Sequence, residues 1–129
     1  LPEGYRAIDT LDEEGNCGVC TIVQADTIKM AEKLQETVGP WLGGGRPINS
    51  GRHVYKHWDV INDKIGGHHK DWDCFRHPKN RKIKTNYRNA LKQSDDFMSR
   101  SCQILTPYGY NRGKTEKMLK EVNGALAKF

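Results

Sequence analysis

The sequence contains no apolar run near the roughly 20 residues that a transmembrane helix requires, so we expect no membrane span. It has no low-complexity tract, no repeat at the period of a solenoid and no Asn-X-Ser/Thr sequon for N-linked glycans. Only 36% of its 129 residues are apolar, whereas 29% are charged. This length and composition are typical of one globular domain with a modest core, which we expect to span residues 1–129.

The sequence has few cysteines, but their number is even: Cys17, Cys20, Cys74 and Cys102. The chain also begins at Leu1 rather than at a methionine. Together these features favour a secreted, extracellular protein with two disulfide bonds. Two alternatives stay open: free thiols, or a zinc site that starts at the first two cysteines, although no second knuckle follows it. We expect no bound metal and no cofactor.

Acidic side chains are missing between Asp73 and Asp95, where seven Lys and Arg residues follow one another. Residues 1–50 carry eight acids and four bases, a net −4, whereas residues 51–129 carry eight acids and 17 bases, a net +9. The seven bases are Arg76, Lys79, Arg81, Lys82, Lys84, Arg88 and Lys92. Such a run is either a solvated face or a patch that follows the phosphates of a nucleic acid.

Aromatic residues are interleaved with these bases, namely Tyr55, Trp58, Trp72, Phe75 and Tyr87. Unpaired RNA bases stack on such rings. A small domain also needs several of its large side chains in the core. The pattern therefore allows an RNA-binding surface, while a solvated basic face with aromatic residues in the core stays open.

The predicted elements give an α+β fold. Asp26 or Thr27 can cap a helix that runs to about Val38, where Gly39-Pro40 stops it, and Thr115 can cap a C-terminal helix. Four segments read as strands: residues 18–23 (an edge strand), 53–61, 71–76 and 101–106. We expect one N-terminal helix packed on a small antiparallel sheet, with an additional C-terminal helix.

No complete catalytic set stands out among the residues. The three glycines at 43–45 lack the Lys-Ser/Thr of a P-loop, so they predict a flexible connection. His57 lies within a predicted strand, a place more typical of a structural imidazole. His68 and His69 would point in opposite directions on a strand and make a poor chelating pair.

A cysteine, a helix, a Gly-rich loop and then Tyr55-Lys56-His57-Trp58 follow one another along the chain. This order resembles that of the guanyl-specific microbial ribonucleases and the fungal ribotoxins, in which a Tyr-Pro-His-aromatic strand follows one helix. Residues 102–107 look like the last strand of ribotoxins. The same scaffold occurs among secreted effectors of plant-pathogenic fungi, many of which have lost the catalytic residues. The resemblance covers residues 17–107 and implies a ribonuclease-like fold.

Carried over residue by residue, the resemblance implies a degenerate active site. Tyr55 and His57 match the first strand, Asp73 falls where the family has a catalytic Glu, and Arg88 matches the phosphate-binding Arg. Pro107 takes the position of the general acid. RNA transesterification needs both a base and an acid, and proline has no proton to donate. The resemblance therefore implies a pseudo-ribonuclease.

The resemblance thus predicts a secreted, catalytically inactive, toxin-like virulence effector that binds RNA or an acidic host protein as a monomer. The RNA-binding residues would be Tyr55, His57, Arg76, Arg81, Lys82, Lys84 and Arg88. Because Cys74 and Cys102 both lie in predicted strands and ribotoxins have a disulfide in a similar region, we also expect a Cys74–Cys102 bridge, which leaves Cys17–Cys20 as the second.

Two other functions stay open at this point. One is an active secreted endoribonuclease or ribotoxin that uses His57, Asp73 and Arg88. The other is a killer-type or antimicrobial protein that acts at an anionic membrane surface through its Lys-rich C-terminal helix.

Overall fold

The computed structural model describes residues 1–66 and 73–129, which form two compact units. Unit 1 comprises residues 1–49 and 95–129, and unit 2 comprises residues 50–94. Their elements are β1 (Tyr5–Ala7), β2 (Cys20–Ala25), α1 (Ile28–Leu42), η1 (Pro47–Asn49), η2 (Tyr55–His57), α2 (Asp59–Asn62), α3 (Lys92–Ser99), β3 (Ser101–Leu105) and α4 (Arg112–Leu126). The expected α+β class, with a helix packed on a small antiparallel sheet and a further C-terminal helix, is confirmed.

The sheet of unit 1 has three antiparallel strands in the order β1-β2-β3. Segment 18–23 was expected at an edge, but β2 lies in the centre and pairs with both neighbours. Its register places Val23 opposite Cys102, and both side chains are buried. The partner on the other side, β1, is a strand that the sequence did not predict. Its Arg6 lies opposite Gln24 and donates from Nε to the Gln24 amide oxygen at 3.0 Å.

Helix α1 begins where the sequence predicts but ends later. The Thr27 hydroxyl accepts a hydrogen bond from the backbone N–H of Met30 at 3.2 Å and caps the helix. Gly39-Pro40 does not stop it, because the helix runs on to Leu42 and brings Trp41 and Leu42 against the core. Gly43, with φ 62°, then ends it as a C-cap residue.

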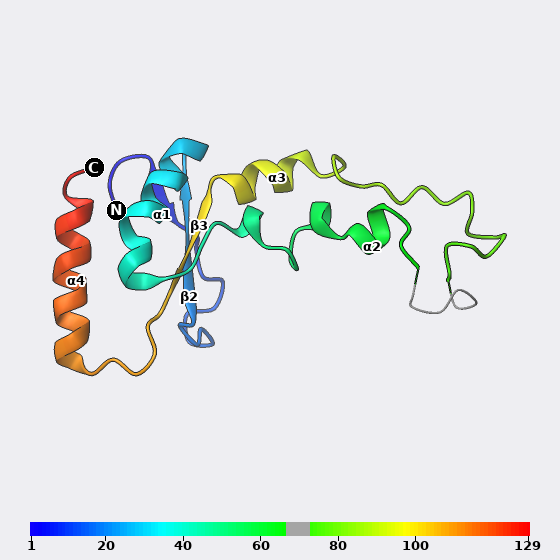
Figure 1. Ribbon diagram of the computed structural model, residues 1–129. Helices are drawn as coiled ribbons and strands as arrows, with labels where there is room; N and C mark the ends of the chain where they lie inside the picture. The colour runs from blue at the N-terminus through cyan, green and yellow to red at the C-terminus, as the bar shows by residue number, and fades with distance from the viewer. Residues whose placement is uncertain (67–72) are drawn as a thin grey trace. The chain divides into compact units, whose positions relative to one another are not determined.

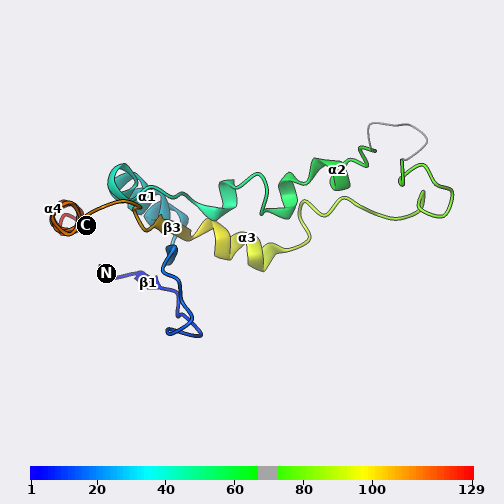
Figure 2. The same cartoon turned by 90° about the horizontal axis from the view of Figure 1, so that it is seen from below.

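The core of unit 1 lies between the sheet and its two long helices. Figures 1 and 2 show α1 between the sheet and α4, and Figure 2 views α4 end-on. The buried cluster consists of Val23, Leu34, Val38, Cys102, Met118 and Val122. Helix α4 starts three residues before the predicted cap, because Asn111 and not Thr115 accepts the hydrogen bond from the Lys114 N–H, at 3.0 Å. Its apolar stripe faces this core.

The glycine-rich loop is fixed to the sheet and is not a loose connection. Gly45 and Gln103 exchange both backbone hydrogen bonds, at 3.1 and 2.8 Å. Gly44 has φ 88°, and a Cβ built on it would lie 2.0 Å from the carbonyl oxygen of Gln103. The expected flexible connection is therefore wrong, and Gly44 is required for close backbone approach.

The described residues of unit 2 form neither of the two strands predicted there. Segment 53–61 forms the short helices η2 and α2, and residues 73–76 form a turn. Residues 71 and 72, and with them Trp72, lie outside the described residues. The aromatic and β-branched side chains that suggested strands instead surround a local cluster, in which Val54 and Tyr55 are buried.

All four cysteines are free thiols in the structure, so neither expected disulfide is present in it. Cys102 is fully buried, and its thiol lies 3.2 Å from the Gln35 side-chain oxygen. Cys74 is exposed in unit 2, and its segment does not form the strand on which the pairing was based. Cys17 is exposed, and Cys20 is half-buried at the start of β2.

Burial should make Cys102 the least reactive thiol. Its pKa is raised mainly by desolvation, so little thiolate forms, and its side chain is not exposed. Under reducing conditions, iodoacetamide should label Cys17 and Cys74 readily and Cys102 only after unfolding. Peptide mass spectrometry over time checks this, and labelling of Cys102 as fast as Cys17 in the folded protein would contradict the packing.

Candidate nucleic-acid interface

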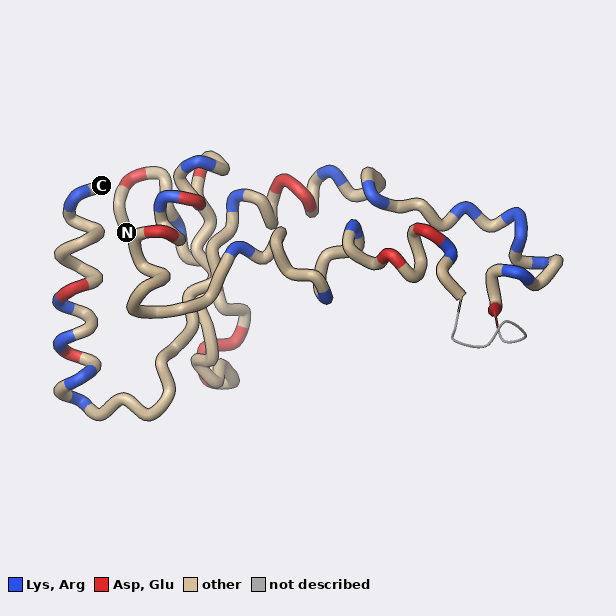
Figure 3. The backbone as a smooth tube through the Cα atoms, in the orientation of Figure 1, with Lys and Arg blue, Asp and Glu red and all other residues tan. Residues whose placement is uncertain are grey.

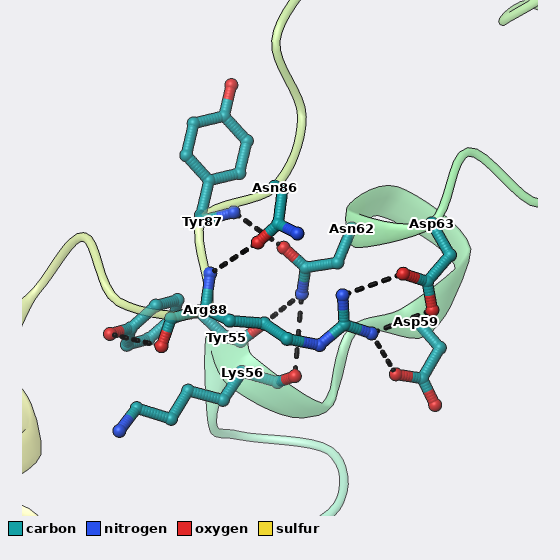
Figure 4. Close-up of polar contacts among 8 residues, drawn as sticks. All are labelled: Tyr55, Lys56, Asp59, Asn62, Asp63, Asn86, Tyr87 and Arg88. Carbon is teal, nitrogen blue, oxygen red and sulfur yellow. Dashed lines mark hydrogen bonds and ion pairs between the residues drawn. The ribbon is translucent and has the colours of Figure 1, made fainter.

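A buried asparagine joins the two chain segments of unit 2 that carry the candidate residues. Asn62, 5% exposed at the end of α2, donates its amide to the Tyr55 carbonyl at 2.8 Å. Its side-chain oxygen accepts the backbone N–H of Tyr87, also at 2.8 Å (Figure 4). The Tyr55 hydroxyl in turn accepts the Leu91 N–H at 3.1 Å. These contacts hold residues 87–91 against η2 and α2.

Arg88 is bound by two carboxylates in the structure. Its guanidinium makes two hydrogen bonds of 2.7 Å to Asp63 and one of 2.8 Å to Asp59 (Figure 4). The hydrogen bond from Arg88 lowers the pKa of Asp63, and the same bonds raise the pKa of Arg88. Because Asp59 and Asp63 are one helical turn apart, both reach the same guanidinium. Arg88 therefore positions the segment and is not offered to a phosphate.

An apolar pocket of about 240 Å³ lies beside this network. It is lined by Tyr55, Trp58, Ile61, Asn62, Tyr87, Ala90 and Leu91. Trp58 and Tyr87 are 44% and 46% exposed, so their rings are accessible to a ligand. Both rings are oriented by backbone acceptors: Trp58 Nε1 donates to Arg52 O at 2.9 Å and the Tyr87 hydroxyl to Lys84 O at 2.9 Å.

The basic segment, defined here as residues 76–92, contributes exposed cations in the same unit. Figure 3 marks its bases in blue, with no acid among them. Arg76 forms a 2.9 Å ion pair with Asp73, and Arg88 is engaged as described. Within the described residues, no carboxylate lies in ion-pair distance of Arg81, Lys82 or Lys84. These three exposed cations lie in a stretch without regular secondary structure.

The degenerate catalytic candidates each have separate local partners. His57 is exposed, with Nδ1 3.0 Å from the Ser50 carbonyl oxygen. Asp73 accepts the Phe75 N–H at 2.9 Å in addition to its ion pair with Arg76. The described residues contain no group of three or more side chains that could hold a metal, and no helix among them is long and apolar enough to cross a membrane. His68 and His69 lie outside the described residues.

Sequence reasoning placed Tyr55 and Arg88 in one RNA-binding set and named Tyr87 among the interleaved aromatic residues, but it missed the residues that hold them. Asp59, Asn62 and Asp63 form that framework. The one available signal was the i, i+4 spacing of the two acids, which places them on one helical face. The strand predicted for residues 53–61 obscured this spacing. No protein-family model and no curated protein matches the chain.

Removing the Asn62 amide should destabilise unit 2. In Asn62→Ala the Tyr55 carbonyl and the Tyr87 N–H lose a buried partner, which costs about 1–3 kcal/mol of unfolding free energy. The exposed Asn89 provides the control, since Asn89→Ala should stay within about 0.5 kcal/mol of wild type. Urea unfolding followed by Trp fluorescence measures both, and equal effects would contradict the role assigned to Asn62.

Proposed function

We propose that this protein binds single-stranded RNA through unit 2 and does not cleave it. The basic segment contacts the phosphates, and the rings of Trp58 and Tyr87 stack on unpaired bases. The observation that carries the proposal is the presence, in one unit, of exposed cations and of a pocket with two exposed aromatic rings. Secretion and a role as an effector remain predictions from the sequence.

Charge supports a polyanionic ligand. Arg81, Lys82 and Lys84 are exposed, and no described carboxylate neutralises them. Placing phosphates there releases counterions from the nucleic acid, which favours binding at low salt. A flexible polyanion can follow an irregular segment of this kind without a groove of fixed width.

The aromatic pocket supports RNA over an acidic protein. Bases present two π-faces for stacking, and base–aromatic stacking is independent of sequence. Trp58 and Tyr87 are held in orientation before any ligand arrives, so binding loses less side-chain entropy. An acidic protein surface would use the cations but would leave these rings without a function.

The absence of cleavage rests on the chemistry of the available groups. A transesterification site needs a base and an acid on opposite sides of one phosphate. Asp73 is engaged by Arg76, Arg88 is engaged by two carboxylates, and Pro107 has no proton to donate. The membrane alternative receives no support from α4, because its Met118 and Val122 are buried in the core.

The test replaces three exposed cations of the basic segment. In Arg81→Ala/Lys82→Ala/Lys84→Ala, binding to a fluorescent 12-nucleotide RNA should weaken, and the slope of log K against log salt should fall by about 2, since each phosphate contact on a single strand contributes about 0.7. The matched control is Arg6→Ala/Lys29→Ala/Lys33→Ala, which removes the same charge from exposed positions of unit 1.

Fluorescence anisotropy at several salt concentrations distinguishes the outcomes. The control variant should retain the wild-type slope. An unchanged slope in the basic-segment variant would show that the segment is a solvated face and would reject the proposal. Equal decreases of the salt slope in both variants would show that binding depends on net charge alone, and would reject the assigned surface. Tighter binding to an acidic peptide than to RNA would favour the protein partner instead.

A further inference from the structure

Unit 1 carries a second basic and aromatic surface, on α4. Two neighbouring hollows, of about 320 and 690 Å³, share Trp41, Lys117 and Glu121. Four lysines line them: Lys114, Lys117, Lys120 and Lys128. We name these two hollows together the α4 groove. The proposed function does not use any of its residues.

The groove has a physical cause in the sequence of α4. Met118 and Val122 are buried in the core. Lys117 and Lys120, one or two positions away along the helix, therefore lie on its exposed side. Gly124 and Ala125 have little or no side chain and leave space between Trp41 and Lys128. Figure 3 shows the basic positions repeated along this helix.

The groove is electropositive because four lysines line it against one acid, Glu121. Glu121 accepts a 2.8 Å hydrogen bond from Trp41 Nε1, which fixes the indole at the boundary of the two hollows. The neighbouring Glu116 is paired with Arg112 at 2.8 Å. Tyr110, 46% exposed, adds a second ring at the end where α4 begins.

We infer that the α4 groove is a second contact surface for the same single-stranded RNA. This inference rests on the proposed function for its ligand, although not for its residues. Fifteen helical residues extend about 22 Å, enough for several phosphates to follow the lysine row. Trp41 and Tyr110 provide ring faces for bases at two points along it. Because both hollows are open to solvent, they fit an RNA strand that passes over them better than a small molecule that needs an enclosed site.

Lysine footprinting on the full-length chain tests both surfaces at once. The protein is treated with an acetylating N-hydroxysuccinimide ester, with and without a saturating 30-nucleotide RNA, and acetylation is quantified by peptide. We expect at least severalfold protection of Lys117, Lys120 and Lys128, and of Lys82 and Lys84 in the basic segment. Lys29, exposed on α1, is the internal reference and should not change.

The two proposals fail in distinguishable ways. Protection of the basic segment alone would overturn this inference and leave the proposed function standing. Protection of α4 alone would support the groove and reject the site in unit 2. To separate direct contact from a conformational effect, Lys117→Ala/Lys120→Ala/Lys128→Ala should lower the salt slope by about 2. An unchanged slope in this variant would reject the groove.

Discussion

Gly44→Ala should strongly destabilise unit 1. The added methyl group would lie 2.0 Å from the Gln103 carbonyl oxygen, and the backbone at φ 88° disfavours any side chain. The positive φ contributes roughly 1–2 kcal/mol and the forced shift of β3 about 1–3 kcal/mol. We expect a loss of about 2–5 kcal/mol, which corresponds to roughly 10 °C or more in Tm for a unit of this size.

The adjacent glycine provides a matched control. A Cβ on Gly45 meets nothing within 4 Å, and its φ is not in the left-handed region. Gly45→Ala should therefore leave Tm nearly unchanged or raise it slightly by restricting the unfolded chain. Thermal unfolding followed by circular dichroism compares the two. If both variants have the same Tm as the wild-type protein, the glycine-rich loop does not approach β3 as described.

Removing both accessible rings of unit 2 should have the largest effect on RNA affinity. Base–aromatic stacking contributes about 1–3 kcal/mol per base, so Trp58→Ala/Tyr87→Ala should weaken binding by roughly 30-fold or more. The salt slope should stay at the wild-type value, because no phosphate contact is lost. This combination separates stacking from charge: loss of the rings lowers affinity alone, whereas loss of the cations lowers both affinity and the salt slope.

Two controls keep this result interpretable. Tyr87→Phe removes only the hydroxyl that donates to Lys84 O and should bind RNA within a few-fold of wild type. Tyr108→Ala removes a ring that is 78% exposed in unit 1 and lines neither the aromatic pocket nor the α4 groove, so it should not alter affinity. Circular dichroism confirms that each variant is folded. Unchanged affinity in a folded double variant would remove the aromatic pocket from the interface.

The sequence predicted unit 1 better than unit 2 for a physical reason. Unit 1 is held by an apolar core, so the periodic stripe of α1, with Leu34 and Val38, and the strand at 101–106 were visible as patterns. The later end of α1 was missed because the contacts of Trp41 and Leu42 with the core outweigh the hydrogen bond lost at Pro40. The short strand β1 has too few residues to show a pattern.

Unit 2 depends on polar contacts between residues distant in the sequence. Asn62 binds Tyr87, and Arg88 binds Asp59 and Asp63, across separations of 25 to 29 residues. No periodicity encodes such pairs. Local composition therefore suggested strands for segments that fold as short helices and turns. Because the contacts of Arg88 with Asp59 and Asp63 could not be read from the sequence, Arg88 was expected to bind a phosphate.

The most direct test is prolonged incubation of the intact protein with an end-labelled 30-nucleotide RNA at low salt. Native gels report retention, and denaturing gels report the length of the RNA. The account predicts that the RNA shifts into a complex that salt dissociates, while its length stays unchanged over a day. Sequence-specific cleavage by the wild-type protein that His57→Ala abolishes would contradict it.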